Sequence, residues 1–99
     1  MEILNNPRGT GKTTIIVNKA IKTGYPILVG TECQKHFLES ITEKYIKVYT
    51  VEEFIHLKEK PKHILIDELP RVLYELLETD VELATMTSKS LEMYDILNK

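Results

Sequence analysis

Short apolar runs alternate along the chain with longer stretches whose apolar residues recur at helical spacing. The apolar runs, each a candidate strand, cover residues 3–4, 25–30, 46–50, 63–67 and 81–86. The candidate helices cover residues 12–23, 32–45, 51–58, 69–77 and a last stretch that begins near Ser88. This alternation is typical of an α/β domain with a mainly parallel sheet. We therefore expect about five strands with helices between them.

Two of the expected helices carry an apolar stripe that should face the core. In the helix that Thr31 would cap, the stripe comprises Cys33, Phe37, Leu38, Ile41 and Tyr45. In the helix that Pro70 begins, it comprises Leu69, Val72, Leu73, Leu76 and Leu77. We expect Cys33 to be a core residue rather than a reactive thiol.

Composition limits what the chain can be. Its 99 residues, of which 42% are hydrophobic and 28% charged, fit one domain spanning residues 1–99. A single cysteine excludes an intramolecular disulfide. No apolar run approaches the roughly 20 residues of a membrane span, and the first residues do not resemble a secretory signal. We expect a cytoplasmic protein that does not bind membranes.

Charge is distributed unevenly. Residues 1–62 contain ten Lys and Arg against seven Asp and Glu, a net charge of +3. Residues 63–99 contain three against eight, a net charge of −5. The first part is therefore the better candidate for facing an anion.

The segment between the first apolar run and the first helix carries the clearest chemistry. Gly9 and Gly11 let backbone amides turn toward a phosphate, and the helix start adds the positive end of its dipole. Lys12 would reach the outer phosphates, and the Thr13 hydroxyl would bind Mg²⁺. This is a Walker A pattern in which Asn6, a residue that tolerates left-handed backbone angles, replaces the usual glycine. The expected nucleotide-binding residues are Asn6, Pro7, Arg8, Gly9, Thr10, Gly11, Lys12, Thr13 and Thr14.

An acidic pair ends the fourth apolar run. Asp67 and Glu68 follow a short buried strand, which is a Walker B pattern. The strand would place Asp67 at the carboxyl edge of the sheet, where ligands bind in open α/β sheets. Asp67 would hold Mg²⁺ through water, and Glu68 would act as the general base on the attacking water. The alternative is that both acids only begin a helix.

Together these motifs resemble the P-loop NTPases that have an additional strand and a catalytic glutamate. The resemblance implies a three-layer α/β/α fold, with ATP and Mg²⁺ as cofactors. It also implies that a sensor strand lies between the strand before the Walker A loop and the Walker B strand. Thr87 would be the sensor of the γ-phosphate, with Thr85 as the second choice.

Finer features resemble the first motor domain of superfamily 1 and 2 helicases and small stand-alone phage-type ATPases. In those helicases, residues placed like Thr31 and Thr50 would face single-stranded nucleic acid. The alternative is that both threonines only cap helices. A basic group, Lys47 with Lys58, Lys60 and Lys62, is another candidate contact with nucleic acid, but a solvated loop explains it equally simply.

Arginine is scarce, which limits the chemistry that the chain can complete alone. The only arginines are Arg8 and Arg71. Arg8 would contact the phosphate or a neighbouring subunit, and either arginine could act as an arginine finger in trans. For Arg71, a solvated side chain is the favoured alternative. No strand is left to flank the first one, and an exposed edge favours pairing with another chain. We expect a homo-oligomer or a protein partner.

Three functions follow from these patterns. The first is a Mg²⁺-dependent ATPase that acts in nucleic-acid transactions through an oligomer or a partner. The second is a nucleotide-binding switch or adaptor that does not hydrolyse ATP. The third, a small-molecule kinase, is disfavoured because neither a substrate motif nor an arginine-rich lid is present.

Overall fold

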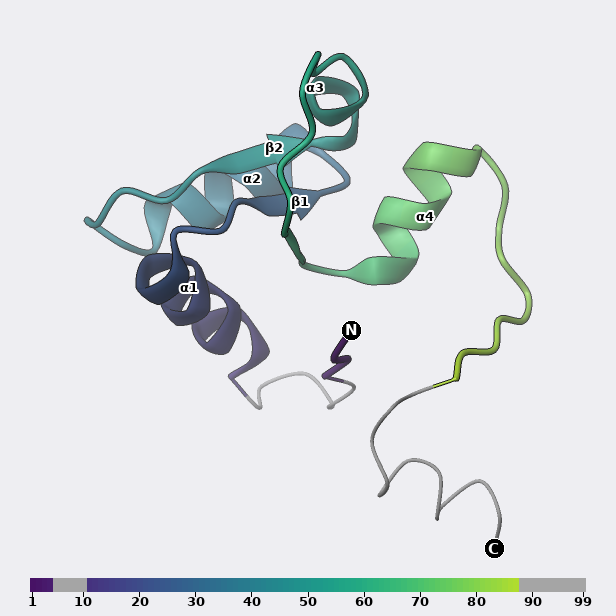
Figure 1. Ribbon diagram of the computed structural model, residues 1–99, viewed down its shortest axis with the longest axis horizontal. Coiled ribbons are helices and arrows are strands. Elements are labelled where there is room, and N and C mark those ends of the chain that lie inside the picture. Colours follow the sequence, from purple (N-terminus) through teal and green to yellow (C-terminus); the bar gives the residue numbers. More distant parts are fainter. Residues whose placement is uncertain (5–10, 88–99) are drawn as a thin grey trace, which may run out of the picture.

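The computed structural model describes residues 1–4 and 11–87 and shows an α/β fold with a small parallel sheet (Figure 1). In chain order the elements are α1 (Lys12–Thr23), β1 (Ile27–Val29), α2 (Glu32–Ser40), β2 (Val48–Thr50), α3 (Val51–Ile55), β3 (Leu65–Ile66) and α4 (Leu69–Leu77). The alternation of strands and helices that the apolar pattern predicts is therefore confirmed from α1 to α4.

Local sequence explains where the helices begin and end. Gly24 adopts a left-handed conformation, with φ 77°, and its N–H donates to the Ala20 carbonyl at 2.8 Å, which ends α1. Thr31 caps α2 through its hydroxyl oxygen, which accepts from the Gln34 N–H at 3.3 Å. Pro70 lies in the first turn of α4, where its missing N–H has no cost.

The sheet has the strand order β2-β1-β3, and both pairings are parallel. Ile27 in the central strand is in register with Val48 on one side and with Leu65 on the other. All three residues of β1 are buried, as expected for the middle strand of a sheet with helices on both faces.

The alternation of side chains along β1 divides the core in two. Ile27 and Val29 pack with Val17 of α1 and Leu38 of α2. Leu28 points to the other face, where it packs with residues of α3 and α4, Val51 and Val72. The chain moves from β1 to β2 in one direction and from β2 to β3 in the other. Right-handed connections then place the intervening helices on opposite faces.

Two of the five expected strands are not formed. Residues 3–4 are exposed and lie outside any strand, and residues 78–87 form neither helix nor strand. The structure therefore does not show the strand expected over residues 81–86. Val81 and Leu83 are 44% and 85% exposed, so no burial of apolar surface compensates for ordering them. The helix expected from Ser88 lies outside the described residues.

The expected apolar faces are also only partly buried. Of the stripe on α2, only Leu38 is buried; Phe37 is 57% exposed, and Cys33 is exposed rather than a core residue. Of the stripe on α4, only Val72 is buried, and Leu77 is 57% exposed. The described three-stranded sheet does not cover either stripe completely. The helix α2 rests on β2 and β1, and α4 rests on β1 and α3. The expected helix over residues 51–58 also ends early, at Ile55.

Candidate functional site

The start of α1 has a left-handed glycine, one feature that a phosphate-binding loop requires. Gly11, the residue before the helix, has φ 83° and ψ 18°, a left-handed conformation that favours glycine. No side chain caps the helix here, and its first turn contains no acidic residue. Among residues 1–4 and 11–87, the first amides of α1 therefore have no capping side chain, and no carboxylate of the first turn competes with an anion there.

The carboxyl end of β3 is fixed by its pairing with β1. The Leu65 N–H donates to the Pro26 carbonyl at 2.9 Å, and the Asp67 N–H donates to the Leu28 carbonyl at 3.1 Å. Asp67 thus extends the parallel ladder by one bond beyond the strand. This anchoring places its half-buried carboxylate at the carboxyl edge of the sheet, as the Walker B pattern predicts.

Electrostatics connect this carboxylate to the start of α1. The pKa of Asp67 is raised above its usual value, first by burial and then by the neighbouring charge of Glu68, while the Lys12 ammonium opposes this rise. Lys12 lies 55 residues earlier in the sequence, so the fold itself brings the two groups within electrostatic reach. The half-buried Lys12 and Asp67 form the centre of the candidate site.

Glu68 has an unusual backbone. It precedes the first residue of α4 with φ 58° and ψ 67°, a left-handed conformation that is costly for a residue other than glycine. Its side chain makes no capping hydrogen bond to the helix and is exposed. Glu68 therefore stands at the start of α4, as the alternative that both acids only begin a helix also expects, but its side chain does not hold the helix end. Backbone strain of this kind is often found at functional positions.

The other residues of the predicted site lie partly in α1, partly in the segment after α4 and partly outside the described residues. Thr13 is half-buried and Thr14 is exposed, both in the first turn of α1. Thr87, the expected sensor, and Thr85 are exposed in the segment without regular structure. The remaining predicted nucleotide-binding residues, Asn6, Pro7, Arg8, Gly9 and Thr10, lie outside the described residues.

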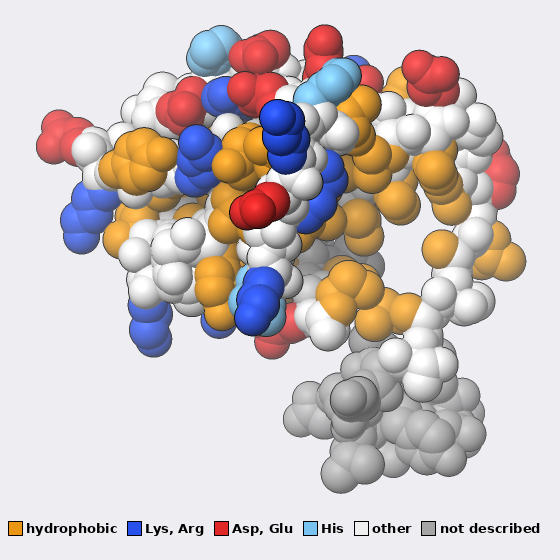
Figure 2. Space-filling view, turned by 45° about the horizontal axis from the view of Figure 1, so that its top comes forward, with side chains coloured by type: hydrophobic (Ala, Val, Ile, Leu, Met, Phe, Trp, Pro, Cys, Tyr) orange, Lys and Arg blue, Asp and Glu red, His pale blue; other side chains and the backbone are white. Residues whose placement is uncertain are grey.

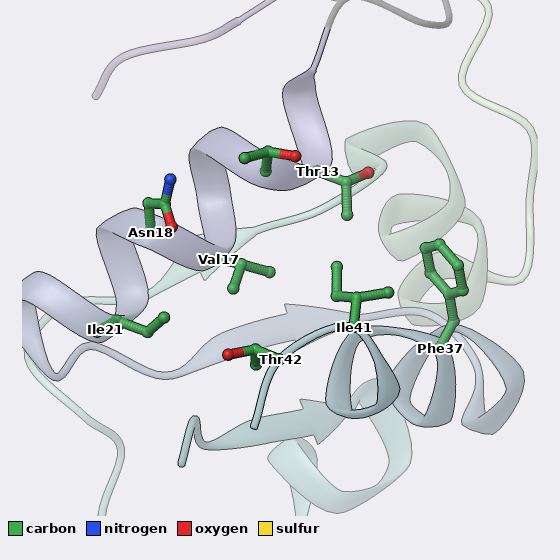
Figure 3. A pocket seen from close by; sticks show the side chains of 8 residues that line it. Thr13, Val17, Asn18, Ile21, Phe37, Ile41 and Thr42 are labelled. Carbon is green, nitrogen blue, oxygen red and sulfur yellow. The ribbon is translucent and has the colours of Figure 1, made fainter. Parts of the chain in front are cut away.

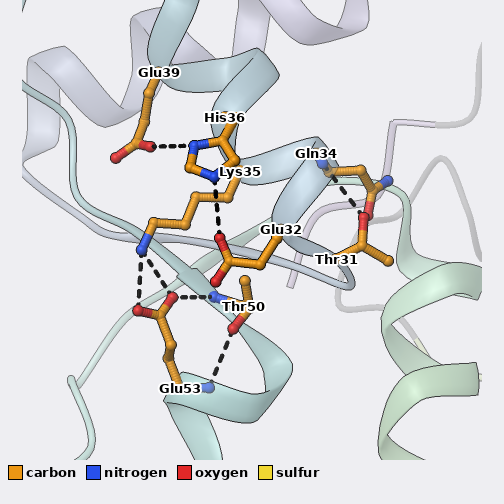
Figure 4. Close-up of polar contacts among 8 residues, drawn as sticks. All are labelled: Thr31, Glu32, Gln34, Lys35, His36, Glu39, Thr50 and Glu53. Carbon is orange, nitrogen blue, oxygen red and sulfur yellow. Dashed lines mark hydrogen bonds and ion pairs between the residues drawn. The ribbon is translucent and has the colours of Figure 1, made fainter.

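The two threonines assigned to nucleic acid are helix caps. Thr50 is 4% exposed, and its hydroxyl accepts from the Glu53 N–H at 3.2 Å while the Glu53 carboxylate accepts from the Thr50 N–H at 3.0 Å. This reciprocal capping box is drawn in Figure 4. Thr31 caps α2 in the same figure. The capping alternative accounts for both hydroxyls.

Sequence reasoning missed an ion pair that joins the two capped helices. The Lys35 ammonium lies 2.9 Å from a carboxylate oxygen of the same Glu53 (Figure 4). Hydrogen bonds from Thr50 and Lys35 lower the pKa of Glu53, and the bond to Glu53 raises the pKa of Lys35. Only the tertiary structure pairs these residues, which are 18 positions apart.

Arg71 is held against its own helix. Its guanidinium lies 2.9 Å from the Glu75 carboxylate, one turn along α4, and 5.8 Å from the ring centroid of Tyr74. The side chain is 52% exposed. A contact with a neighbouring subunit would therefore require breaking a pair that is already formed.

A cavity of about 350 Å³ lies beside the site, between α1 and α2. Thr13 is at one end, and Val17, Ile21, Phe37 and Ile41 supply most of the wall (Figure 3). Neither Asp67 nor Glu68 lines it. The cavity therefore adjoins Thr13 and Thr14, two of the predicted nucleotide-binding residues, without containing the acidic pair.

The donor set suits Mg²⁺ better than a metal held by protein alone. Among the described residues, no group of three His, Cys, Asp or Glu side chains is placed to hold a metal ion. Mg²⁺ usually keeps several waters and binds one or two carboxylates together with substrate phosphates. The Thr13 hydroxyl and the Asp67 carboxylate fit that pattern.

In the described part of the chain, no helix is long and apolar enough to cross a membrane.

Comparisons with protein-family models, with curated proteins and with solved structures found no match to this chain. Its function must therefore be argued from its own residues.

Proposed function

We propose that this chain is an ATP-binding domain of the P-loop type that hydrolyses ATP with Mg²⁺. The observation that carries the proposal is that the Lys12 charge acts on the half-buried Asp67 carboxylate, which follows β3 at the carboxyl edge of the sheet. The left-handed Gly11 and the uncapped start of α1 support the same proposal, since both suit a bound phosphate.

Each residue has a defined task in this proposal. The Lys12 ammonium would neutralise the outer phosphates, and the first amides of α1 would donate to the inner ones. Thr13 and Asp67 would hold Mg²⁺, which supplies the charge that the transferring phosphoryl group needs. The exposed Glu68 carboxylate would accept a proton from the attacking water.

The full sheet of the proposed domain would have five strands. The order β2-β1-β3 leaves the outer edge of β3 without a partner strand among the described residues. A sensor strand formed by residues 81–86 would fit there and would bring Thr87 toward the phosphates. The strand expected around residues 3–4 would follow it, ahead of the phosphate-binding loop. Burial of Val81 and Leu83 against α4 would favour this arrangement.

We further propose that the activity serves nucleic-acid transactions, through a homo-oligomer or a protein partner. Arg71 is engaged with Glu75, so no arginine in the described part of the chain is placed to reach a bound phosphate without rearrangement. Stimulation by a partner would compensate for this, because an arginine finger supplied in trans raises turnover by roughly 10³–10⁵-fold.

ATP binding and hydrolysis, measured with and without Mg²⁺, test this function. Lys12→Ala should abolish binding, and Glu68→Gln should preserve binding but abolish hydrolysis. Hydrolysis that survives in Glu68→Gln would contradict the catalytic assignment. Tight binding without turnover under any condition would instead favour the second candidate, a nucleotide-dependent switch. The open position of Glu68, which excludes no water, gives that candidate its support.

A further inference from the structure

Lysines and aromatic rings gather on a surface away from the phosphate site. The lysine–aromatic surface comprises Lys47, Tyr49, Phe54 and Lys60, together with Lys58 and Lys62 from the same loop as Lys60. Lys47 directly precedes β2, and residues 58–62 lead from α3 to the start of β3. Asp67 instead follows β3, so it lies at the opposite end of the parallel strands.

Contacts between rings and ammonium groups hold this surface together. The Lys47 Nζ lies 5.1 Å from the ring centroid of Tyr49, and the Lys60 Nζ lies 5.4 Å from that of Phe54. The two rings meet edge to face, with centroids 6.4 Å apart. Lys60 also donates to the Leu57 carbonyl. These contacts position both ammonium groups without neutralising their charge.

Lysines outnumber carboxylates on this surface, although the exposed Glu59 lies between Lys58 and Lys60 in sequence and Glu53 lines a hollow together with Lys47. Lys47, Lys58, Lys60 and Lys62 form no ion pair with any residue that the structure describes. Lys35 and Arg71, in contrast, each pair with a glutamate. Figure 2 shows blue side chains along the middle of the molecule, with red side chains both among them and above them. A net positive charge therefore remains on a chain whose overall charge is −2.

A second pair of rings extends the surface. Tyr25, just before β1, stacks on His63, just before β3, with centroids 5.0 Å apart and planes 30° apart. His63 is exposed and follows Lys62 directly. Tyr25, Lys47 and His63 therefore lie just before β1, β2 and β3, at the same end of the parallel strands.

We propose that the lysine–aromatic surface binds single-stranded nucleic acid. Phosphates would contact the ammonium groups, a combination with base stacking that is typical of proteins that bind single strands. Unstacked bases would lie on the exposed His63 ring and on those edges of the half-buried Tyr49 and Phe54 rings that the core and the lysines leave uncovered. A duplex hides its base faces, and an acidic peptide has none, so either would use only the lysines. The proposal deepens the proposed function and rests on it only for the link to ATP hydrolysis.

Binding of a labelled oligothymidylate, measured by fluorescence anisotropy at several salt concentrations, tests this proposal. The variant Lys47→Gln with Lys60→Gln should bind roughly tenfold more weakly at low salt. Its logarithmic salt dependence should be shallower by about 0.7 for each lost phosphate contact. The matched control, Lys19→Gln with Lys22→Gln, removes the same charge from exposed positions on α1 and should bind like the unaltered protein. Equal loss in both variants would overturn the proposal.

Tyrosine fluorescence distinguishes stacking from simple attraction of a polyanion. The chain contains five tyrosines and no tryptophan, so its emission reports on the tyrosine rings. Oligothymidylate should quench this emission, whereas heparin and polyglutamate should not. Equal quenching by all three would refute a surface that recognises bases.

The same variants separate this proposal from the proposed function. Lys47→Gln with Lys60→Gln should retain ATP binding, and Lys12→Ala should retain oligothymidylate binding. If Lys12→Ala loses ATP binding and Lys47→Gln with Lys60→Gln retains it, the nucleotide site is supported. That conclusion holds whether or not the lysine–aromatic surface binds oligothymidylate.

Discussion

Gly30 and Arg71 approach each other so closely that no side chain fits at position 30. A Cβ atom on Gly30 would lie 2.8 Å from the Arg71 Cγ and 3.3 Å from the Arg71 carbonyl oxygen. Gly30 directly follows β1, and Arg71 lies in the first part of α4. The absence of a side chain therefore lets the helix that follows Glu68 approach the carboxyl end of the central strand.

We expect Gly30→Ala to destabilise the protein by about 1–3 kcal/mol, the usual cost of overpacking. Urea unfolding measures the change. Arg71→Ala removes the Cγ and should reduce the cost in a double-mutant cycle. A cost that is unchanged in the Arg71→Ala background would show that the remaining contacts, with the Glu75 Cγ at 3.2 Å and the Arg71 carbonyl oxygen at 3.3 Å, set the distance.

Removing the backbone strain at Glu68 should separate stability from activity. Glu68→Gly should stabilise the fold by about 1 kcal/mol, because glycine adopts a positive φ without penalty. It should also abolish hydrolysis, since it removes the proposed base. Thermal unfolding and ATP turnover are the two measurements.

Glu78 provides a matched control for that prediction. It has φ 55° at the end of α4, away from the acidic pair. Glu78→Gly should give a similar stabilisation and leave turnover unchanged. If Glu78→Gly also reduced turnover, the loss in Glu68→Gly could not be assigned to the missing carboxylate.

Asp67 should destabilise the ligand-free protein at neutral pH. Burial, followed by the charge of Glu68, raises its pKa in the folded state, so the folded state disfavours the ionised form. The free energy of unfolding therefore carries no penalty from Asp67 at low pH, where the carboxyl is protonated. It decreases as the pH rises through the raised pKa of the folded state. Asp67→Asn should therefore be more stable than the unaltered protein at neutral pH and should lose Mg²⁺-dependent ATP binding. Asp80→Asn, at an exposed position, should change neither property.

The Lys35–Glu53 pair predicts a pH dependence of the opposite sign in acid. The pKa of Glu53 is lowered in the folded state, first by its hydrogen bond from the Thr50 backbone and then by Lys35. Its contribution is complete above the ordinary pKa of 4.5 and is lost as the pH falls through the lower folded value. For Lys35, whose pKa is raised, the contribution is complete below 10.5 and is lost at higher pH. Urea unfolding of Glu53→Gln should show a weaker loss of stability in acid than the unaltered protein shows.

Local patterns predicted the elements that depend on neighbouring residues. Gly11, Gly24, Thr31 and Thr50 begin or end helices where expected, because each acts through its own backbone or through residues a few positions away. The strand before Asp67 was also correctly located, although it is shorter than expected. Those predictions needed no knowledge of distant contacts.

Predictions that depended on burial were less successful. Phe37 and Leu77 lie on stripes with helical spacing, but spacing cannot show whether a neighbouring layer exists to cover them. The strand expected over residues 81–86 had the same weakness, because a strand needs a partner at its edge. In the described sheet, β3 pairs only with β1, so no strand lies at its other edge.

The sequence by itself determined the chemistry available at each end of a strand or helix: the left-handed glycine before Lys12, the acids after β3 and the caps of α2 and α3. Only the tertiary structure decided which of these groups meet. Parallel pairing of β3 with β1 holds Asp67 at the sheet edge where Lys12 acts on it, and the return of the chain after α3 places Lys60 on the same surface as Lys47. The physical reason is that local preferences act over a few residues, whereas burial and charge act between residues that the fold brings together.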